Sequence, residues 1–181
     1  MCIRDSPRKA LDSYERYLER KPYHDWGFTK LVETAVSLNE LDELVDRWEA
    51  RLAASPDDTA ARVVLGRLYA RTLEFDAAIE TLSQIPEETA LLGLLMGSLY
   101  LERNNTEEAI TALDRAVTLT QDREELEQIH DLRGEAFLAR GNREEATAAF
   151  HAIAELEPES FHLRLEAASK LAFNGLFEEA I

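Results

Sequence analysis

The feature that most constrains this chain is a repeat of about 34 residues. Small side chains recur at Val32, Gly66, Gly97, Gly134 and Ala168, in steps of 34, 31, 37 and 34 residues. The short step and the long step together make two full repeats, so one unit is shifted and the repeat itself is kept. A period of this length is typical of proteins that stack small structural units along one axis.

The clearest unit is Leu132–Pro158, which contains two amphipathic helical patterns separated by a Gly-Asn pair. In the second pattern Ala146, Phe150 and Ile153 are four and three residues apart, which places them on one helical face. Gly134 lies inside the first pattern, although a glycine within a helix costs about 1 kcal/mol relative to alanine. We therefore predict that Gly134 and Ala146 lie where two adjacent helices touch.

Local signals predict where helices begin and end. Asn142, followed three residues later by Glu145, predicts a helix N-cap whose side chain accepts a backbone amide. Pro86 predicts that one helix ends at Ile85 and that Pro86 itself lies in the first turn of the next helix. The long step falls at residues 120–125, where we expect three additional residues before the next helix.

Composition and charge exclude several classes of function. The 36 acidic and 20 basic residues give a net charge of −16, which argues against binding nucleic acid or an anionic membrane through a general electrostatic field. No run of about 18 apolar residues predicts a transmembrane helix. The four histidines are not paired at helical spacing and there is one cysteine, so we expect no metal site and no cofactor. Phosphate-binding glycine loops and the common hydrolase motifs are absent, so we do not predict an enzyme.

A helix–turn–helix repeat of this length, with small, aromatic and proline columns, resembles the tetratricopeptide repeat family. The resemblance covers nearly the whole chain from Pro7 and is carried by Leu65, Gly66, Tyr69, Ala78, Leu82, Met96, Gly97, Tyr100, Ala109, Ala116, Gly134, Phe137, Ala146, Phe150 and Pro158. It implies an all-α fold, a right-handed α-solenoid built from antiparallel helix hairpins.

The repeat also predicts the domain organisation. Residues 7–181 are expected to form a single repeat domain, and residues 1–6 to be non-native sequence or unstructured. The predicted units are a partial hairpin at 7–24, repeats at about 25–58, 59–89, 90–126 and 127–160, and a partial hairpin at 161–181. Because the pattern begins and ends within hairpins, we expect a fragment of a longer repeat array.

The resemblance implies that the first helices of the hairpins line a concave groove for a peptide or a helical segment. The residues predicted there are Trp26, Glu33, Arg67, Arg71, Leu91, Leu94, Ser98, Leu101, Glu102, Asp131, Glu135, Leu138 and His162. The leucines would form an apolar floor, unless they belong to the core, and the carboxylates an acidic rim. The two arginines would pair with Glu102 or meet an acidic group of a ligand. The expected partner is a protein or peptide with apolar anchors and basic residues, and the ends of the stack are expected to self-associate.

The sequence is compatible with three functions. The leading hypothesis is a noncatalytic protein-binding scaffold. The second is a regulatory or substrate-docking segment of a larger enzyme whose catalytic domain lies outside this sequence. The third is a catalytic helical repeat protein with a site around Ser98, Glu135 and His162.

Overall fold

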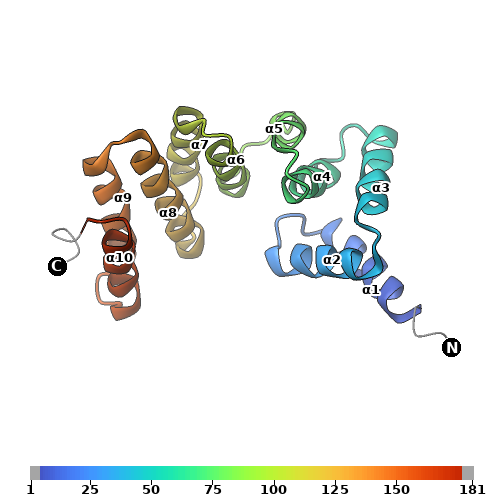
Figure 1. Ribbon diagram of the computed structural model, residues 1–181, viewed down its shortest axis with the longest axis horizontal. Helices are drawn as coiled ribbons and strands as arrows, with labels where there is room; N and C mark the ends of the chain where they lie inside the picture. The colour runs from blue at the N-terminus through green and yellow to red at the C-terminus, as the bar shows by residue number, and fades with distance from the viewer. Residues whose placement is uncertain (1–4, 177–181) are drawn as a thin grey trace. The chain divides into compact units, whose positions relative to one another are not determined.

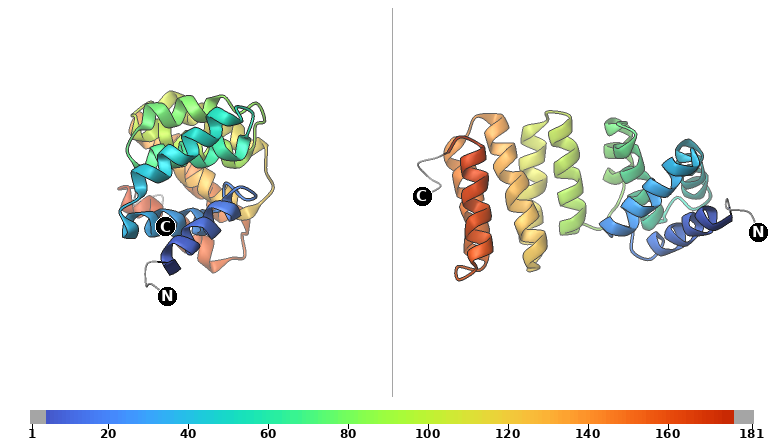
Figure 2. Two further views of the ribbon diagram at one scale, coloured as in Figure 1. Left: turned by 90° about the vertical axis from the view of Figure 1, so that its right-hand side faces the viewer. Right: turned by 60° about the horizontal axis from the view of Figure 1, so that its bottom comes forward.

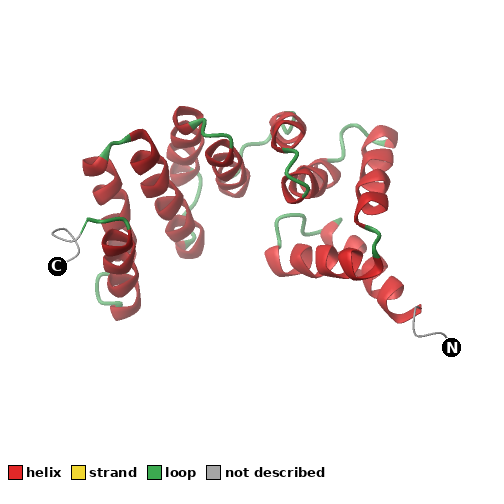
Figure 3. Ribbon diagram, in the orientation of Figure 1, coloured by secondary structure: helices red, strands yellow, loops and turns green. Residues whose placement is uncertain are grey.

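The computed structural model describes residues 5–176, which form ten α-helices and no β-strand (Figures 1 and 3). The prediction of an all-α repeat fold is therefore confirmed for the described residues. The chain divides into two compact units, Met1–Pro86 and Glu87–Ile181. Helix α1 begins at Asp5, two residues before the predicted start of the repeat domain. Residues 1–4 and 177–181 lie outside the described residues, and with them the end of the partial hairpin predicted at 161–181.

In the first unit each helix packs against the next one along the chain. Its helices are α1 (Asp5–Leu18), α2 (Asp25–Leu38), α3 (Leu41–Ala54), α4 (Thr59–Arg71) and α5 (Phe75–Ser83). Leu31, Leu44, Trp48 and Leu68 are fully buried and belong to one apolar core that α1 to α4 share. In α2 and α3 the buried residues recur every three or four positions, so one stripe of each helix faces this core, whereas α4 is buried around most of its circumference at residues 63–68.

The second unit also consists of antiparallel hairpins (Figure 2, right). Its helices are α6 (Ala90–Glu102), α7 (Thr106–Thr118), α8 (Arg123–Arg140), α9 (Arg143–Leu156) and α10 (Phe161–Phe173). One apolar cluster lies among α6, α7 and α8, and a second lies among α9, α10 and the end of α8. The helices that come first in their hairpins, α6, α8 and α10, carry most of the predicted groove residues.

Three glycines of the repeat column lie opposite a large side chain of the following helix. An added Cβ would lie 2.6 Å from Leu82 at Gly66, 2.6 Å from Leu113 at Gly97 and 2.3 Å from Phe150 at Gly134. Non-bonded carbon atoms are normally about 3.5–4.0 Å apart, so no side chain fits at these positions without movement of the partner. The prediction of close helix contact at Gly134 is confirmed, and Ala146 is fully buried in the adjoining core.

The predicted side-chain cap at Asn142 is wrong. Asn142 occupies the N-cap position of α9, but its side chain accepts no backbone amide, and its Nδ2 instead donates to Glu145 Oε1 at 3.4 Å. The short turn accounts for this, because the Asn142 backbone amide donates to the Phe137 carbonyl and ψ is 78°. The side chains of Thr89 and Ser160 do accept a backbone amide. Each of these residues follows a longer connection between helices and has an extended backbone.

The two irregular steps of the repeat also differ from their predicted form. Helix α5 ends at Ser83 and α6 begins at Ala90 after the cap Thr89, so Pro86 lies in the connection and not in the first turn of α6. The additional residues near 120–125 do not all precede the next helix. Asp122 accepts the amides of Glu124 and Glu125 and starts α8 at Arg123, so these residues lengthen α8 to 18 residues.

Candidate functional site

The predicted groove residues lie on the first helices of the hairpins. Trp26 and Glu33 lie on α2, Arg67 and Arg71 lie on α4, and the other nine lie on α6, α8 and α10. Because the chain divides into two compact units, these residues form two candidate surfaces, one on each unit.

Arg67 is a structural contact of the first unit. Its guanidinium donates to the Pro22 carbonyl at 2.7 Å and to Asp25 Oδ1 at 2.5 Å, and it lies 4.1 Å from the centre of the Phe28 ring. Burial lowers the pKa of Arg67, although Asp25 opposes that effect. Arg67 therefore holds α4 to the start of α2, in place of the suggested pairing with Glu102. Arg71, one turn later, is exposed and has no ion-pair partner within residues 5–176.

The other feature of the first surface is a row of aromatic rings. Trp26 is 59% exposed, and its ring centre lies 6.0 Å from that of Tyr14 and 6.5 Å from that of His24. The His24 ring in turn lies 5.2 Å from that of Tyr17, and all three contacts are edge-to-face. Exposed tryptophan and tyrosine side chains supply large contact areas at protein interfaces.

In the second unit the predicted apolar floor is partly core. Leu94 and Leu101 are half-buried and pack against the cluster among α6, α7 and α8, while Leu138 packs against the cluster beneath α9 and α10. Leu91 is also half-buried, and the Ser98 hydroxyl donates to the Leu95 carbonyl at 2.9 Å. These leucines offer only part of their surface to a ligand.

A polar seam joins α8 to α10. Lys170 of α10 donates to Asp131 Oδ2 of α8 at 2.5 Å, while Asp131 Oδ1 is buried without a partner in the described structure. Burial lowers the pKa of Lys170, but the hydrogen bond and the charge of Asp131 outweigh it, so the pKa is raised. Asp131, predicted for the acidic rim, therefore also stabilises the contact between two hairpins.

Carboxylates flank this ion pair on both sides. Burial, followed by repulsion from Glu166, raises the pKa of Glu127 above its usual value. Burial, followed by the charge of Asp131, does the same for Glu135. The seam thus holds more carboxylate groups than cations, and Glu127, Asp131 and Glu166 are half-buried in it.

Sequence reasoning did not identify Glu127, Glu166 or Lys170 as parts of this site. A signal was present, because the two facing rows each repeat every four residues. The rows are Glu127, Asp131 and Glu135 on α8, and His162, Glu166 and Lys170 on α10. Spacing on one helix cannot show which residues of another helix lie opposite.

Helix α10 also carries large apolar side chains that are exposed. Phe161 is 72% exposed, Leu165 55% and Phe173 91%. A shallow hollow on α10 is lined by His162, Leu165, Glu166, Ser169, Lys170 and Phe173. Side chains of this size gathered on one helix of a protein surface are a feature of interaction sites.

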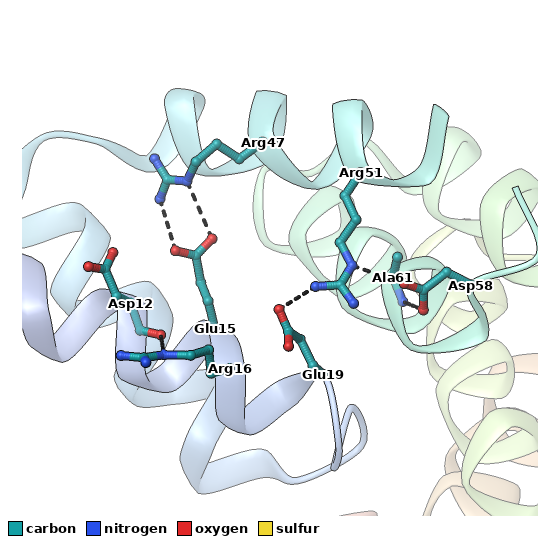
Figure 4. A network of polar contacts seen from close by, with 8 residues as sticks. All are labelled: Asp12, Glu15, Arg16, Glu19, Arg47, Arg51, Asp58 and Ala61. Carbon is teal, nitrogen blue, oxygen red and sulfur yellow. Dashed lines mark hydrogen bonds and ion pairs between the residues drawn. The ribbon is translucent and has the colours of Figure 1, made fainter. Parts of the chain in front are cut away.

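A second polar network lies between α1 and α3 (Figure 4). Its contacts join residues that are 32 positions apart: Arg8 with Glu40, Glu15 with Arg47, and Glu19 with Arg51. Arg51 also bonds Asp58, whose other oxygen caps α4 by accepting the Ala61 amide at 2.9 Å. These ion pairs connect the second helices of neighbouring hairpins.

The described residues show no constellation for catalysis. No contact joins Ser98, Glu135 and His162, and the His162 side chain is 79% exposed, with Nδ1 4.0 Å from Glu166. Within the described part of the chain, no group of three histidine, cysteine or acidic residues could hold a metal ion. None of the helices that the structure describes is long and apolar enough to cross a membrane.

Comparison with known proteins places the repeat in a family. Residues 94–123, from the middle of α6 to the start of α8, match the family model described as the tetratricopeptide repeat. The chain therefore contains a match to one tetratricopeptide repeat, over 30 of its 181 residues. No curated protein matches its sequence significantly.

Solved structures of tetratricopeptide-repeat proteins share its fold. MamA superposes with a TM-score of 0.65 at 20% identity, over 81% of this chain and 85% of MamA. TTC0263 from Thermus thermophilus gives a TM-score of 0.62 at 22% identity, over 90% of this chain and 89% of that protein. YrrB, described as having an unusual peptide-binding site, gives 0.59 at 19% identity, over 94% and 88%. At these identities the likeness concerns the fold alone.

Proposed function

We propose that this helical-repeat protein is a noncatalytic scaffold that binds a protein segment on the surface of α8 and α10. The tetratricopeptide-repeat fold itself is typical of protein–protein interaction. The observation that carries the proposal is the set of exposed apolar side chains on α10, Phe161, Leu165 and Phe173, beside the carboxylate-rich seam. The peptide-binding site named for YrrB supports a similar use of this fold.

The charge distribution indicates the chemistry of the partner. Residues 87–181 contain 20 of the 36 acidic residues but only 8 of the 20 basic ones. Such a unit attracts basic segments and loses part of that attraction as salt screens it, over about 8 Å at physiological ionic strength. Apolar anchors contribute about 25 cal/mol per Å² buried, before the costs of association are subtracted. We therefore propose a partner with apolar anchors and neighbouring lysine or arginine residues.

The candidate surfaces of the two units also support three further proposals. The groove on the first unit would use the exposed residues Trp26, Glu33 and Arg71, because Arg67 is already paired. A role as the docking or regulatory segment of a larger enzyme makes the same binding prediction. Self-association is also proposed, because both units expose apolar or aromatic side chains.

Fluorescence anisotropy with a labelled amphipathic peptide of leucine and lysine tests the proposal. The double variant Glu135→Lys, Glu159→Lys changes two exposed acids, one on α8 and one just before α10. The matched control Glu108→Lys, Glu144→Lys makes the same change in net charge on α7 and α9.

We expect the first variant to weaken binding about tenfold or more at low salt, and the control to change it much less. A peptide of leucine and glutamate should not bind. Equal losses in both variants would mean that the peptide responds to the whole acidic chain, and the proposed surface would be wrong.

A further inference from the structure

Helix α8 buries one ionisable side chain that the proposed function does not use. His130 is 8% exposed and lies in the interior of the second unit, where α8 packs against both α7 and α9. Burial of an imidazole favours its neutral form, because the charged form loses its hydration. The protonation of His130 therefore depends on the side chains that surround it.

The repeat shows that packing does not require a histidine at this position. Four residues before the small-residue column, the other first helices carry Phe28, Arg62, Gly93 and Arg164. In the first unit the ring of Phe28 also meets an arginine, at 4.1 Å from Arg67 Cζ, and it carries no proton that can dissociate. His130 is the one residue of this column that gains and loses a proton near neutral pH.

A hydrogen bond from Arg133 determines which nitrogen of the His130 ring is free of a proton. Arg133 Nη1 lies 3.3 Å from His130 Nδ1, one helical turn away. A guanidinium can only donate hydrogen bonds, so Nδ1 accepts this bond and the neutral ring carries its proton on Nε2. The same arginine connects α8 to α7, because its Nε donates to Asp114 Oδ1 at 2.7 Å. A charge on the ring would therefore act directly on a contact between two helices.

The groups around the ring oppose its protonation. Burial lowers the pKa of His130 below its usual value, and the positive charge of Arg133 lowers it further. Glu155 on α9 opposes this effect, but it is exposed to solvent, and Asp114 on α7 is already paired with Arg133. Among the described residues, α6 and α10 bring no charged group that acts on the ring.

We infer that His130 is a pH-sensitive contact that holds α8 to α7 at neutral pH and releases it in mild acid. A proton on Nδ1 removes the acceptor of the Arg133 bond and places two cations side by side in a buried site. The stabilisation is complete above 6.5, the ordinary pKa of histidine, and is lost as pH falls through the lower pKa of the folded chain. The inference concerns the second unit alone and does not depend on the proposed binding of a peptide.

Nuclear magnetic resonance of the whole chain with isotope-labelled histidine tests the state of the ring. Spectra that correlate ring protons with ring nitrogens show which nitrogen carries the proton. We expect His130 to be protonated on Nε2 alone at neutral pH. We also expect it to take up a second proton at lower pH than in the urea-unfolded chain, or only as the chain loses its structure. A proton on Nδ1 at neutral pH, or a pKa no lower than in the unfolded chain, would overturn the inference.

Two variants replace the ring by side chains that do not titrate. His130→Gln keeps an acceptor for Arg133, and His130→Phe introduces the residue that α2 carries at the same place in the repeat. The matched control His151→Gln removes an exposed histidine from α9. Thermal unfolding followed by circular dichroism gives the melting temperature of each chain at several pH values.

Between about pH 7.5 and about pH 5, we expect the melting temperature of the parent to fall by at least about 2 °C more than that of either His130 variant. The control should follow the parent, because its ring is not buried. An equal fall in the parent and in the His130 variants would overturn the inference. If neither variant folds, the magnetic resonance titration of the parent decides the question by itself.

Hydrogen exchange followed by mass spectrometry locates the contact that is released. At about pH 5 we expect the amides of α7 and α8 to exchange faster in the parent than in His130→Gln, and the amides of the first unit to exchange equally. Faster exchange that is confined to helices other than α7 and α8 would overturn the assignment of the contact to His130 and Arg133.

Discussion

Replacing Gly134 by alanine tests the packing that defines the repeat. The new Cβ would lie 2.3 Å from Phe150 Cε1 and 2.4 Å from its Cζ. Phe150 is fully buried in the cluster with Ile153 and Leu171, so its ring cannot move without displacing other core side chains. Overpacking of this kind costs about 1–3 kcal/mol. Alanine regains about 1 kcal/mol of helix propensity, so we expect a net loss of up to about 2 kcal/mol.

Urea unfolding followed by far-ultraviolet circular dichroism measures this loss as a lower midpoint. Gly27→Ala is the matched control, because its Cβ would meet the half-exposed side chain of Tyr17 at 2.8 Å and His24 Nδ1 at 3.2 Å, and neither residue belongs to the buried core. We expect that control to stay within about 0.5 kcal/mol of the parent. Combining Gly134→Ala with Phe150→Leu should cost less than the sum of the single changes, with a coupling of at least about 0.5 kcal/mol. Stabilisation by Gly134→Ala would show that helix propensity acts alone, and the argument from close packing would be refuted.

The remaining predictions concern polar groups. Arg67→Leu should lower the free energy of unfolding by about 1–3 kcal/mol because the Pro22 carbonyl loses its donor, whereas Arg71→Leu should change it by less than about 0.5 kcal/mol in the same urea titration. Glu127→Gln should raise the melting temperature at neutral pH, because the raised pKa of Glu127 means that its ionised form destabilises the fold. That gain should be complete above the pKa of Glu127 in the folded chain and vanish as pH falls below 4.5, the ordinary pKa of a glutamate. A gain that persists in acid would contradict the electrostatic cause.

The features that sequence could predict depend on contacts within one hairpin. Gly134 and Phe150 belong to helices that are adjacent in the chain, and a short turn fixes how those helices meet. Their spacing alone therefore indicated which face each helix buries. The same reasoning applies to Gly66 with Leu82 and accounts for the correct fold class.

Contacts between different hairpins were not predictable in this way. Lys170 bonds Asp131 across 39 positions, and Arg67 bonds Asp25 across 42. Both pairs depend on the rotation of one hairpin against the next, which hydrophobic periodicity does not specify. The cap predicted at Asn142 is wrong for another reason: the Asn142 backbone amide bonds the Phe137 carbonyl in the turn that ends α8.

The ion pairs between α1 and α3 bear on how the first unit unfolds. Each pair links one hairpin to the next, so it strengthens the coupling between repeats and not the intrinsic stability of either. Exposed pairs of this kind contribute about 0–1 kcal/mol each and are screened by salt. Ionic strength therefore adjusts the cooperativity of the array: in dilute salt α1 opens together with α3, and in concentrated salt α1 frays independently while the apolar core beneath it persists.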